Sequence, residues 1–458
     1  MALSTAVVEA LRGIFRASEF STDPAECLAY GYDNSRRQAQ PDAVVYPSAH
    51  EQVVALVRAC RAARVPLTAR GRGTNTTGAT VPVAGGVVAS FERMNRILRI
   101  DGDNRCAVVE PGVLNGDLQM ALAEHGFFWP PDPTSAPYCS IGGNLACNAA
   151  GPRAVKYGSC RENVLGLRAV AGSGAEFRCG VYTTKGAVGY DLTRLLIGSE
   201  GTLALVTEAT LRLTPKPAAT RTLSASYVDA AAAAAAVARI MAQPATPCAL
   251  EFLDDESLRL ARAHAGDAIP QAGALLIIET DGDADGAARA AQAVAAAARG
   301  AGLLDLKIAG NEKETAALWA ARKALSPALR TLSPDKINED VVVPVARLPE
   351  LIQNLHGISI RHRVPIVGFG HAGNGNLHVN LLPRDEGERQ RAEAALADVF
   401  ACVIRLDGTL SGEHGIGLAK RGFLAQAIDP AALALMRRIR AQFDPDGILN
   451  PGKLLPPD

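Results

Sequence analysis

Two histidines late in the chain have the spacing of facing residues in a β-hairpin. The stretch VPIVGFGHAGNGNLHVNLL contains two apolar runs that flank Asn374 and Gly375, the dipeptide most favoured in a two-residue type I′ turn. Such a turn pairs His371 with His378, with Cβ atoms about 4.5–5.5 Å apart, and Asn380 follows on the same face. Imidazoles placed in this way suit a divalent metal such as Zn²⁺ or Mn²⁺, whereas a lone histidine is more often structural. The sequence therefore predicts a metal site on this hairpin.

An acidic residue and another histidine are adjacent in a glycine-rich turn further along the chain. In GTLSGEHGIGLAKR, Glu413 and His414 stand between Gly412, Gly415 and Gly417. A carboxylate and an imidazole on a constrained turn are able to supply a third metal ligand and a general base. The residue types favour this interpretation no more than that of a solvated loop, and both stay open at this point.

A glycine-rich loop early in the chain has the composition of an anion-binding loop. Gly71, Gly73 and Gly78 punctuate ARGRGTNTTG, and glycines let backbone N–H groups surround a pyrophosphate. The loop has neither the GKS or GKT of a Walker loop nor the GxGxxG dinucleotide pattern. Taken alone, it is more typical of a structural turn.

Two further glycine-rich stretches favour a flat, nucleotide-like cofactor. PPDPTSAPYCSIGGNLACNAAG contains Asn144 and Asn148, whose amides are able to hydrogen-bond the edge of a heterocycle. GSEGTLALVTEATLRLTPKP places Glu200 in a tight turn before a strand. Together with the first loop, these stretches shift the interpretation from a structural turn towards a cofactor site.

The elements that must position these residues fall into two regions. AVVYP, EQVVALVRACRAARV and PLTARGRGTNTTG alternate strand-like and helical periodicity, which predicts an α/β or α+β first domain. TPKPAAT, residues 214–220, has two prolines and no periodicity, so it is the best candidate for a domain boundary. Beyond it, a strand, an alanine-rich helix and a strand occur twice, which predicts a ferredoxin-like domain with helices on an antiparallel sheet.

Composition limits the classes of partner. The 458 residues include 47 Lys and Arg against 47 Asp and Glu, so no basic surface for nucleic acid or anionic membrane is expected. No run approaches the ~18 apolar residues of a membrane span, and the N-terminal stretch lacks a secretory signal, which predicts a cytoplasmic protein. The nine cysteines are an odd number without a CxxC pair, which argues against a disulfide framework or a thiolate zinc site. Small molecules and proteins are the expected partners.

The three glycine-rich stretches, in this order and spacing, resemble the FAD-binding domain of the vanillyl-alcohol oxidase or p-cresol methylhydroxylase superfamily. The resemblance implies that the diphosphate lies in the GRGTNTTG loop and that the later turns line the ribityl chain and isoalloxazine. Ala150 and Ala204 replace glycines of the family pattern, which negative φ values would tolerate. Members with covalent flavin generally carry a linking histidine in the first loop, and this loop has none, so FAD bound without a covalent bond is expected. The implied FAD-binding residues are Arg72, Gly73, Thr74, Asn75, Thr76, Thr77, Gly78, Pro131, Asp132, Ser140, Ile141, Gly142, Gly143, Asn144, Cys147, Asn148, Gly151, Tyr157, Gly158, Glu200, Gly201, Val206 and Asn450.

The late motifs GHAGNGNLH, SGEHGIG and FDPDGILNPGK resemble the C-terminal signatures of FAD-linked D-2-hydroxyacid dehydrogenases. That family includes D-lactate dehydrogenases, D-2-hydroxyglutarate dehydrogenases and the flavin subunit of glycolate oxidase. The similarity extends over nearly the whole chain, from about residue 41 to residue 456. It implies that His371, His378 and Glu413 bind the metal and that His414 is the catalytic base.

The same resemblance implies the substrate-binding residues. The family's arginine for the substrate carboxylate follows tryptophan in a Trp-x-x-Arg pattern, which Trp319 and Arg322 match, and a bidentate arginine suits a carboxylate. The lysine that follows in D-2-hydroxyglutarate dehydrogenases is replaced by Asn338, and the nearest lysine is Lys336. With Asn380 these residues form the expected substrate site, and the replacement favours a monocarboxylate such as D-lactate.

The expected fold is a two-domain α+β flavoprotein with its active site between the domains. Residues 1–216 bind FAD, residues 217–418 form a ferredoxin-like substrate cap with the metal site, and residues 419–458 return to the FAD domain. The expected reaction is oxidation of a D-2-hydroxy acid to a 2-oxo acid. Arg322 holds the carboxylate, the metal polarises the hydroxyl, His414 removes its proton, and the α-hydrogen passes as hydride to flavin N5.

The sequence contains no haem or iron–sulfur cysteine pattern, so an external cytochrome, quinone or electron-transfer flavoprotein is expected to reoxidise the flavin. Alternative functions are the flavin subunit of a glycolate oxidase complex, a D-2-hydroxyglutarate dehydrogenase, and a non-catalytic flavoprotein with a structural metal. A homodimer and peripheral association with the inner membrane stay open.

Overall fold

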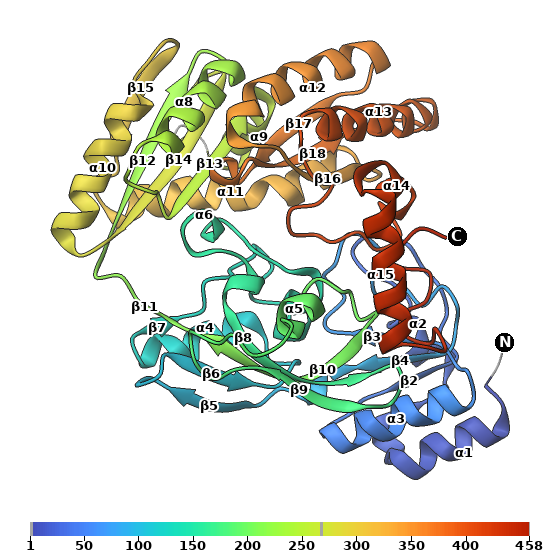
Figure 1. Ribbon diagram of the computed structural model, residues 1–458. Helices are drawn as coiled ribbons and strands as arrows, with labels where there is room; N and C mark the ends of the chain where they lie inside the picture. The colour runs from blue at the N-terminus through green and yellow to red at the C-terminus, as the bar shows by residue number, and fades with distance from the viewer. Residues whose placement is uncertain (1–2, 266–268, 458) are drawn as a thin grey trace. The chain divides into compact units, whose positions relative to one another are not determined.

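The computed structural model describes residues 3–265 and 269–457. The chain divides into two compact units, each formed from separate parts of the sequence (Figure 1). Unit 1 contains residues 1–150, 158–216 and 413–458, and unit 2 contains residues 151–157 and 217–412. The division after Lys216 falls within the proline-containing stretch that the sequence indicates as a boundary. In contrast to the expected domains, residues 413–418 belong to unit 1 and residues 151–157 to unit 2.

Unit 1 contains one mixed sheet, one five-stranded antiparallel sheet and a two-stranded antiparallel sheet of β7 and β11. The first has the order β1-β2-β4-β3, in which β2, β4 and β3 are parallel and α3 connects β2 to β3. Helix α3 buries Val53, Leu56 and Val57 against this sheet, at the spacing of an amphipathic helix. The second sheet has the order β5-β6-β10-β8-β9. The elements of unit 1 are α1 (Thr5–Ile14), η1 (Ala17–Glu19), β1 (Phe20–Ser21), α2 (Pro24–Leu28), β2 (Ala43–Val45), α3 (His50–Ala62), β3 (Leu67–Arg70), β4 (Val87–Ser90), η2 (Phe91–Arg93), β5 (Ile97–Asp101), β6 (Cys106–Val109), α4 (Asn115–Glu124), β7 (Phe127–Phe128), α5 (Ile141–Cys147), η3 (Cys160–Glu162), β8 (Val164–Ala171), β9 (Glu176–Gly180), α7 (Leu192–Leu196), β10 (Ala204–Arg212), β11 (Thr214–Pro215), η7 (Arg421–Phe423), α14 (Leu424–Ala427) and α15 (Pro430–Phe443).

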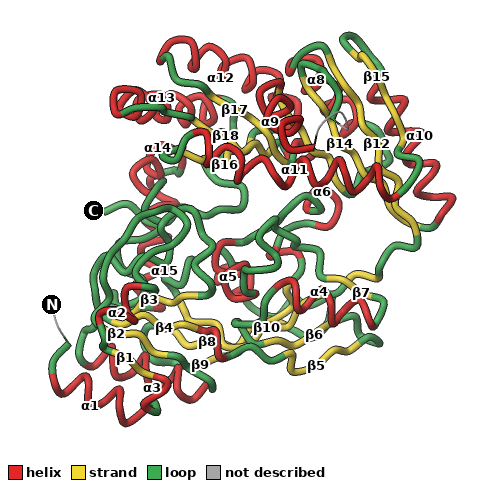
Figure 2. The backbone as a smooth tube through the Cα atoms, turned by 180° about the vertical axis from the view of Figure 1, so that it is seen from behind, coloured by secondary structure: helices red, strands yellow, loops and turns green. Residues whose placement is uncertain are grey.

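Unit 2 is built on an antiparallel sheet of order β15-β12-β14-β13-β17-β18-β16 (Figure 2). Its first four strands in space have the order of a ferredoxin-like fold, with α8 and α10 as the connecting helices, and the predicted two-domain α+β fold is confirmed. Strands β17, β18 and β16 extend that sheet beyond β13. The elements of unit 2 are α6 (Ala154–Tyr157), β12 (Ala219–Tyr227), α8 (Ala230–Ala242), β13 (Ala249–Asp254), α9 (Asp255–Ala265), β14 (Ala274–Gly282), α10 (Ala284–Ala298), β15 (Leu303–Ile308), α11 (Glu312–Leu332), β16 (Ile337–Val342), η5 (Val345–Arg347), α12 (Leu348–His362), β17 (Ile366–Gly370), η6 (Ala372–Asn374), β18 (Asn376–Leu381) and α13 (Glu386–Arg405).

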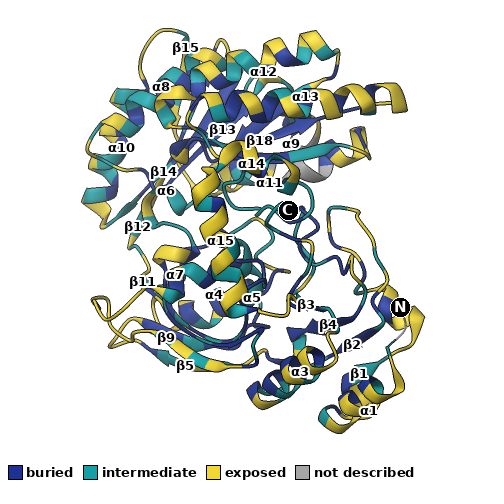
Figure 3. Cartoon of the chain, turned by 45° about the vertical axis from the view of Figure 1, so that its right-hand side comes forward, coloured by how far each residue is buried: buried dark blue, intermediate teal, exposed yellow. Residues whose placement is uncertain are grey.

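The sequence specifies both the helix starts and the buried strands of unit 2. Asp229, Asp283, Asn311 and Asp385 each accept a hydrogen bond from a backbone amide three residues on, which caps α8, α10, α11 and α13. Strands β13, β14 and β18 are buried along most of their length (Figure 3). A charged or polar side chain on these strands therefore needs a partner inside the protein. None of the described helices combines the length and apolar character that crossing a bilayer requires.

Candidate active site

The three glycine-rich stretches meet around helix α5 of unit 1. A side chain on Gly71 would collide with Ser140 Oγ and would lie 3.5 Å from the backbone of Gly143, so the first loop passes over the start of α5. The third stretch packs on the other end of the helix, where the Glu200 amide donates to the Ala146 carbonyl at 2.9 Å. The fold thus brings together three stretches that are far apart in the sequence.

The first loop has features that suit the diphosphate of FAD. Gly73 and Gly78 have φ values of +65° and +80°, which glycine adopts without strain. Thr76 Oγ1 is buried and makes no hydrogen bond to any described residue, and a buried hydroxyl normally has a partner. A ligand rich in acceptor oxygens would provide that partner, so the loop fits the predicted group.

Two asparagines that were predicted to face the flavin use their amides on protein partners. Asn144 Oδ1 accepts from Asn115 at 3.0 Å, and its Nδ2 donates to Cys139 Sγ at 3.2 Å. Asn148, with φ of +52°, accepts from the Ser159 hydroxyl at 2.9 Å. These contacts stabilise the turns at the two ends of α5, and contact of the two amides with the heterocycle stays a prediction.

Glu200 and Asn450 connect the third glycine-rich stretch to the end of the chain. The Glu200 carboxylate accepts from the amides of Ile416 and Gly417 at 2.6 and 2.9 Å, and Asn450 Nδ2 donates to the carbonyls of Glu200 and Ala79 at 2.7 and 2.9 Å. Burial raises the pKa of Glu200 to about 7, and the two backbone amides oppose that rise. Both side chains therefore hold the walls of the predicted cofactor site in place.

Three members of the predicted FAD set have contacts outside the glycine-rich stretches. Arg72 is exposed and lies 3.8 Å from Glu92 Oε2. Gly151 and Tyr157 belong to unit 2, where the Tyr157 hydroxyl donates to Asp281 Oδ2 at 2.6 Å. The FAD contacts of all residues in the set stay predictions.

The hairpin of unit 2 corrects the predicted register by two residues. Strands β17 and β18 pair Phe369 with His378, not His371 with His378. The segment that follows His371 is a 3₁₀ turn, and Gly375 has φ of +73° while Asn374 does not have a positive φ, whereas a type I′ turn needs positive φ at both central residues. The ring centroids of His371 and His378 nevertheless lie 5.2 Å apart. The predicted pair is thus brought together by a different turn.

A buried carboxylate that the sequence analysis did not identify joins His371 to Arg322. Glu251, in the middle of β13, is fully buried, with Oε1 2.5 Å from His371 Nδ1 and Oε2 2.6 Å from Arg322 Nε. The Arg322 guanidinium also lies 4.7 Å from the centre of the Phe369 ring. Burial alone would raise the pKa of Glu251, but its two partners, His371 and Arg322, outweigh burial and lower the pKa to about 2.

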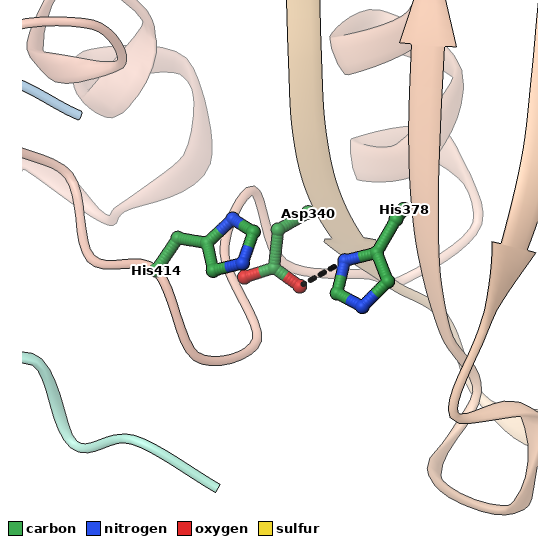
Figure 4. A group of neighbouring side chains, drawn as sticks. All are labelled: Asp340, His378 and His414. Carbon is green, nitrogen blue, oxygen red and sulfur yellow. Dashed lines mark ion pairs between the residues drawn. The ribbon is translucent and has the colours of Figure 1, made fainter. Parts of the chain in front are cut away.

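A second buried carboxylate, Asp340 of β16, lies opposite His378 in the strand ladder. Its Oδ1 is 3.9 Å from His378 Nδ1 (Figure 4) and accepts from Asn376 Nδ2 at 2.6 Å. Its Oδ2 accepts from the Gly412 amide at 2.9 Å. Asp340 therefore fixes the residue that immediately precedes Glu413.

Glu413 and His414 are the next two residues after Gly412, so the backbone holds them close to the contact between Gly412 and Asp340. Among the described residues, two groups of three have ligand atoms that all lie within 4.8 Å of one another. One group is Asp340, His378 and His414, and the other is His371, His378 and Glu413. The second group is the predicted metal-binding set. Two imidazoles and a carboxylate form a donor set that fits Zn²⁺ or Mn²⁺.

The predicted substrate residues Lys336 and Asn380 are in contact with each other. Lys336 Nζ donates to Asn380 Oδ1 at 3.1 Å, and Asn380 is two residues from His378 on β18. Burial, with a smaller contribution from Arg330, lowers the pKa of Lys336 to about 8. A second cation therefore stands near the histidines, although Asn338 occupies the position of the family's lysine.

Only one sequence signal pointed to the two buried carboxylates. CALEFLD and INEDVV place acidic residues in short strand-like runs beside Ile, Val, Leu or Phe, and a charge on a buried strand requires a buried partner. The partners of Glu251 lie 71 and 120 residues away along the chain. The sequence therefore indicates that a partner exists without identifying it.

Comparisons with known proteins agree with this fold. The family profile described as "FAD linked oxidases, C-terminal domain" matches residues 216–454, and that described as "FAD binding domain" matches residues 41–180. The solved structure of p-cresol methylhydroxylase with substrate bound has a TM-score of 0.81 and 16% sequence identity, and the match covers 98% of this chain and 96% of that one. At this identity the likeness shows the fold alone.

Three relatives of similar length have different named substrates. The glycolate oxidase subunit GlcD of Bacillus subtilis is 39% identical over 456 residues, which cover 99% of this chain and 97% of the relative. A D-lactate dehydrogenase of Anaerostipes hadrus is 33% identical over 432 residues, 91% of this chain and 90% of the relative. A D-2-hydroxyglutarate dehydrogenase of Stutzerimonas stutzeri is 33% identical over 467 aligned positions, 98% of each chain.

Proposed function

Because this chain belongs to the family of FAD-linked oxidases, we propose that it oxidises a D-2-hydroxy acid to the 2-oxo acid with FAD as the first electron acceptor. The observation that carries the proposal is the buried group in which Glu251 joins His371 to Arg322. A 2-hydroxy acid has a carboxylate and a hydroxyl on adjacent carbons. An arginine for the carboxylate beside an imidazole that binds a metal for the hydroxyl matches that pair of groups.

Each residue of the site has a separate task in this proposal. Arg322 binds the substrate carboxylate and orients the α-carbon. His371, His378 and Glu413 would hold the divalent metal, which supplies a Lewis acid for the hydroxyl. His414 accepts the hydroxyl proton as general base. FAD, bound by the glycine-rich stretches of unit 1, supplies the acceptor for two electrons and the α-hydrogen.

A short monocarboxylate such as D-lactate is the proposed substrate, and the relatives named for glycolate and D-lactate support it. Arg322 is the one cation assigned to a substrate carboxylate, and a second desolvated carboxylate without a fixed cation would cost several kcal/mol. We therefore expect kcat/KM for D-lactate to exceed that for D-2-hydroxyglutarate by at least about tenfold.

D-2-hydroxyglutarate is the second candidate substrate, because Lys336 lies beside Asn380 and one relative is named for this reaction. Lys336 Nζ is able to pair with the second carboxylate of this substrate while the lysine is protonated. If kcat/KM favours the dicarboxylate, and Lys336→Met removes that preference alone, the second candidate is correct.

The electrons leave the flavin by way of an external acceptor, such as a cytochrome, a quinone or an electron-transfer flavoprotein. The relative from Bacillus subtilis is named as a subunit, so a role as the flavin subunit of a glycolate-oxidising complex is the alternative. Copurification with an iron–sulfur subunit would favour that alternative.

Anaerobic addition of hydroxy acids to the FAD-loaded protein tests the proposal. D-lactate should bleach the flavin absorption at about 450 nm, because an enzyme of this kind reduces its flavin with substrate. L-lactate should not, because the proposed substrate is the D enantiomer. Testing glycolate and D-2-hydroxyglutarate in the same assay identifies the substrate class. If no 2-hydroxy acid bleaches the flavin, the protein is not this enzyme, and a non-catalytic flavoprotein with a structural metal becomes the correct description.

A further inference from the structure

The carboxylate of Glu251 has two partners, and each of its oxygens is used by one of them. Oε1 lies 2.5 Å from His371 Nδ1, and Oε2 lies 2.6 Å from Arg322 Nε. Glu251 is fully buried, so water does not reach this side chain. A buried carboxylate is costly unless it is fully paired. Its two partners are His371, a proposed metal ligand, and Arg322, the proposed anchor for the substrate carboxylate.

The contact with His371 determines which ring nitrogen is available to a metal. An ionised carboxylate only accepts hydrogen bonds, so the hydrogen of the imidazole is on Nδ1 and the lone pair is on Nε2. A carboxylate behind a metal-binding histidine fixes its tautomer and orientation and makes the ring a better ligand. Glu251 therefore presents His371 as an Nε2 ligand.

The contact with Arg322 determines which part of the guanidinium faces a substrate. Glu251 accepts from Nε, and the guanidinium lies 4.7 Å from the centre of the Phe369 ring. Glu251 thus contacts the Nε edge of the planar guanidinium, and Phe369 contacts its face. The two terminal nitrogens then form the edge that binds a carboxylate in a bidentate manner.

We propose that Glu251 is a positioning residue that sets the metal ligand His371 and the substrate anchor Arg322 at the same time. The inference rests on the proposed function and adds a residue and a coupling to it. Because one carboxylate orients both groups, its loss should weaken the binding of metal and of substrate together. A residue that only balances buried charge would change stability without changing either binding constant.

The test compares Glu251→Gln with Glu279→Gln in the FAD-loaded full chain. Glutamine keeps the shape of the side chain but has one acceptor oxygen, so its NH₂ group must face either His371 Nδ1 or Arg322 Nε. Glu279, on the adjacent strand β14, accepts from Trp319 Nε1 at 2.6 Å and from Thr222 Oγ1 at 3.0 Å. Both donors bond to the same oxygen, Oε1, so glutamine is able to keep both contacts, and the substitution controls for loss of a carboxylate beside β13 without change at His371 or Arg322.

The first readout is the dissociation constant for Zn²⁺ or Mn²⁺, measured by competition with a chromogenic chelator in the absence of substrate. We expect Glu251→Gln to raise it by about 10–100-fold, as loss of a carboxylate behind a metal-bound histidine does, and Glu279→Gln to leave it at the wild-type value. The KM for D-lactate should rise in Glu251→Gln alone. Wild-type metal affinity in Glu251→Gln would overturn the proposal.

A second readout needs no variant of Glu251 and so does not depend on how that variant folds. In metal-free wild-type protein with ¹⁵N-labelled histidine, the His371 signal, assigned with His371→Asn, should show a hydrogen on Nδ1. A hydrogen on Nε2 would overturn the proposal. The metal affinity and the ¹⁵N signal do not depend on turnover, so failure of all hydroxy acids to reduce the flavin would refute the proposed function separately from the role of Glu251.

Discussion

Replacing Asp340 with asparagine tests whether the turn that carries Glu413 and His414 must be held in place for catalysis. In the wild type, Asp340 Oδ1 accepts from Asn376 Nδ2 at 2.6 Å, and Oδ2 accepts from the Gly412 amide at 2.9 Å and from the Ser411 hydroxyl at 3.3 Å. Asparagine has one acceptor oxygen, so one of these buried N–H groups would face an NH₂ group. Leaving a buried donor unsatisfied costs about 1–3 kcal/mol, and we expect the free energy of unfolding to fall by about that amount.

The expected effect on the reaction is larger than the effect on stability. Glu413 is the next residue after Gly412, so loss of the Gly412 contact releases both a metal ligand and the proposed base. A displacement of ~1 Å in a catalytic group costs about 100-fold in rate. We therefore expect flavin reduction by D-lactate to slow by about 100-fold in Asp340→Asn, with FAD still bound because the glycine-rich stretches of unit 1 are unchanged.

Stopped-flow measurement of anaerobic flavin reduction, with thermal denaturation and FAD content in parallel, checks this expectation. Asp254→Asn is the control, because the Asp254 carboxylate also accepts two backbone amides, from Ser257 and Gly368, at 2.8 and 2.5 Å. The control should lose similar stability and keep the wild-type reduction rate. Wild-type flavin reduction in Asp340→Asn, or an equal loss of rate in the control, would refute the reasoning.

FAD should separate intact from the protein on acid or heat denaturation, because the first glycine-rich loop contains no histidine; flavin that stays with the precipitated protein would contradict this. His371→Ala and His378→Ala should each lower the metal content and abolish turnover while FAD stays bound, since both residues are in unit 2. Full activity of either variant in the presence of a chelator would exclude the metal role. Lys336, with its pKa lowered to about 8 by burial and by Arg330, is charged below that pH and neutral above it. The KM for D-2-hydroxyglutarate should therefore rise above about pH 8, by up to about tenfold per pH unit, while that for D-lactate should not; the same rise in Lys336→Met would show that another group is responsible.

The hairpin shows how far local sequence predicts this site. Its two apolar runs and the Asn374–Gly375 dipeptide correctly predicted two antiparallel strands that bring His371 and His378 close together. The turn itself depends on a distant residue, because the Val343 amide donates to the Gly375 carbonyl at 3.0 Å, and a side chain on Gly375 would collide with the Val343 carbonyl. A dipeptide preference contains no information about that contact, and the predicted register was therefore wrong by two residues.

The asparagines around α5 illustrate a second limit. The glycine-rich stretches indicated a common site, and the structure does bring them together at Gly71, Gly143 and Glu200. Asn144 and Asn148 have the right chemistry for a heterocycle, and in the structure they also accept hydrogen bonds from Asn115 and Ser159 that hold the turns at the ends of α5. Glycine positions indicate where the backbone turns, and the sequence shows them directly. A polar side chain has several possible hydrogen-bond partners, and the fold determines which of them it contacts.

The order of synthesis has a consequence for flavin loading, because unit 1 is completed by the last residues of the chain. Leu67 of β3, the strand that leads into the first glycine-rich loop, forms a parallel bridge with Leu449, and its carbonyl accepts from the Asn450 amide at 2.8 Å. A growing chain emerges from the ribosome N-terminus first, so this side of β3 stays unpaired until residues 448–450 have emerged. All of unit 2 has been synthesised by then, and it is free to fold before the N-terminal part of the chain is complete. A nascent chain stalled before Leu449 would contain every glycine-rich stretch and still lack the contacts of Asn450 with Ala79 and Glu200, so we expect flavin retention only after this segment has been synthesised.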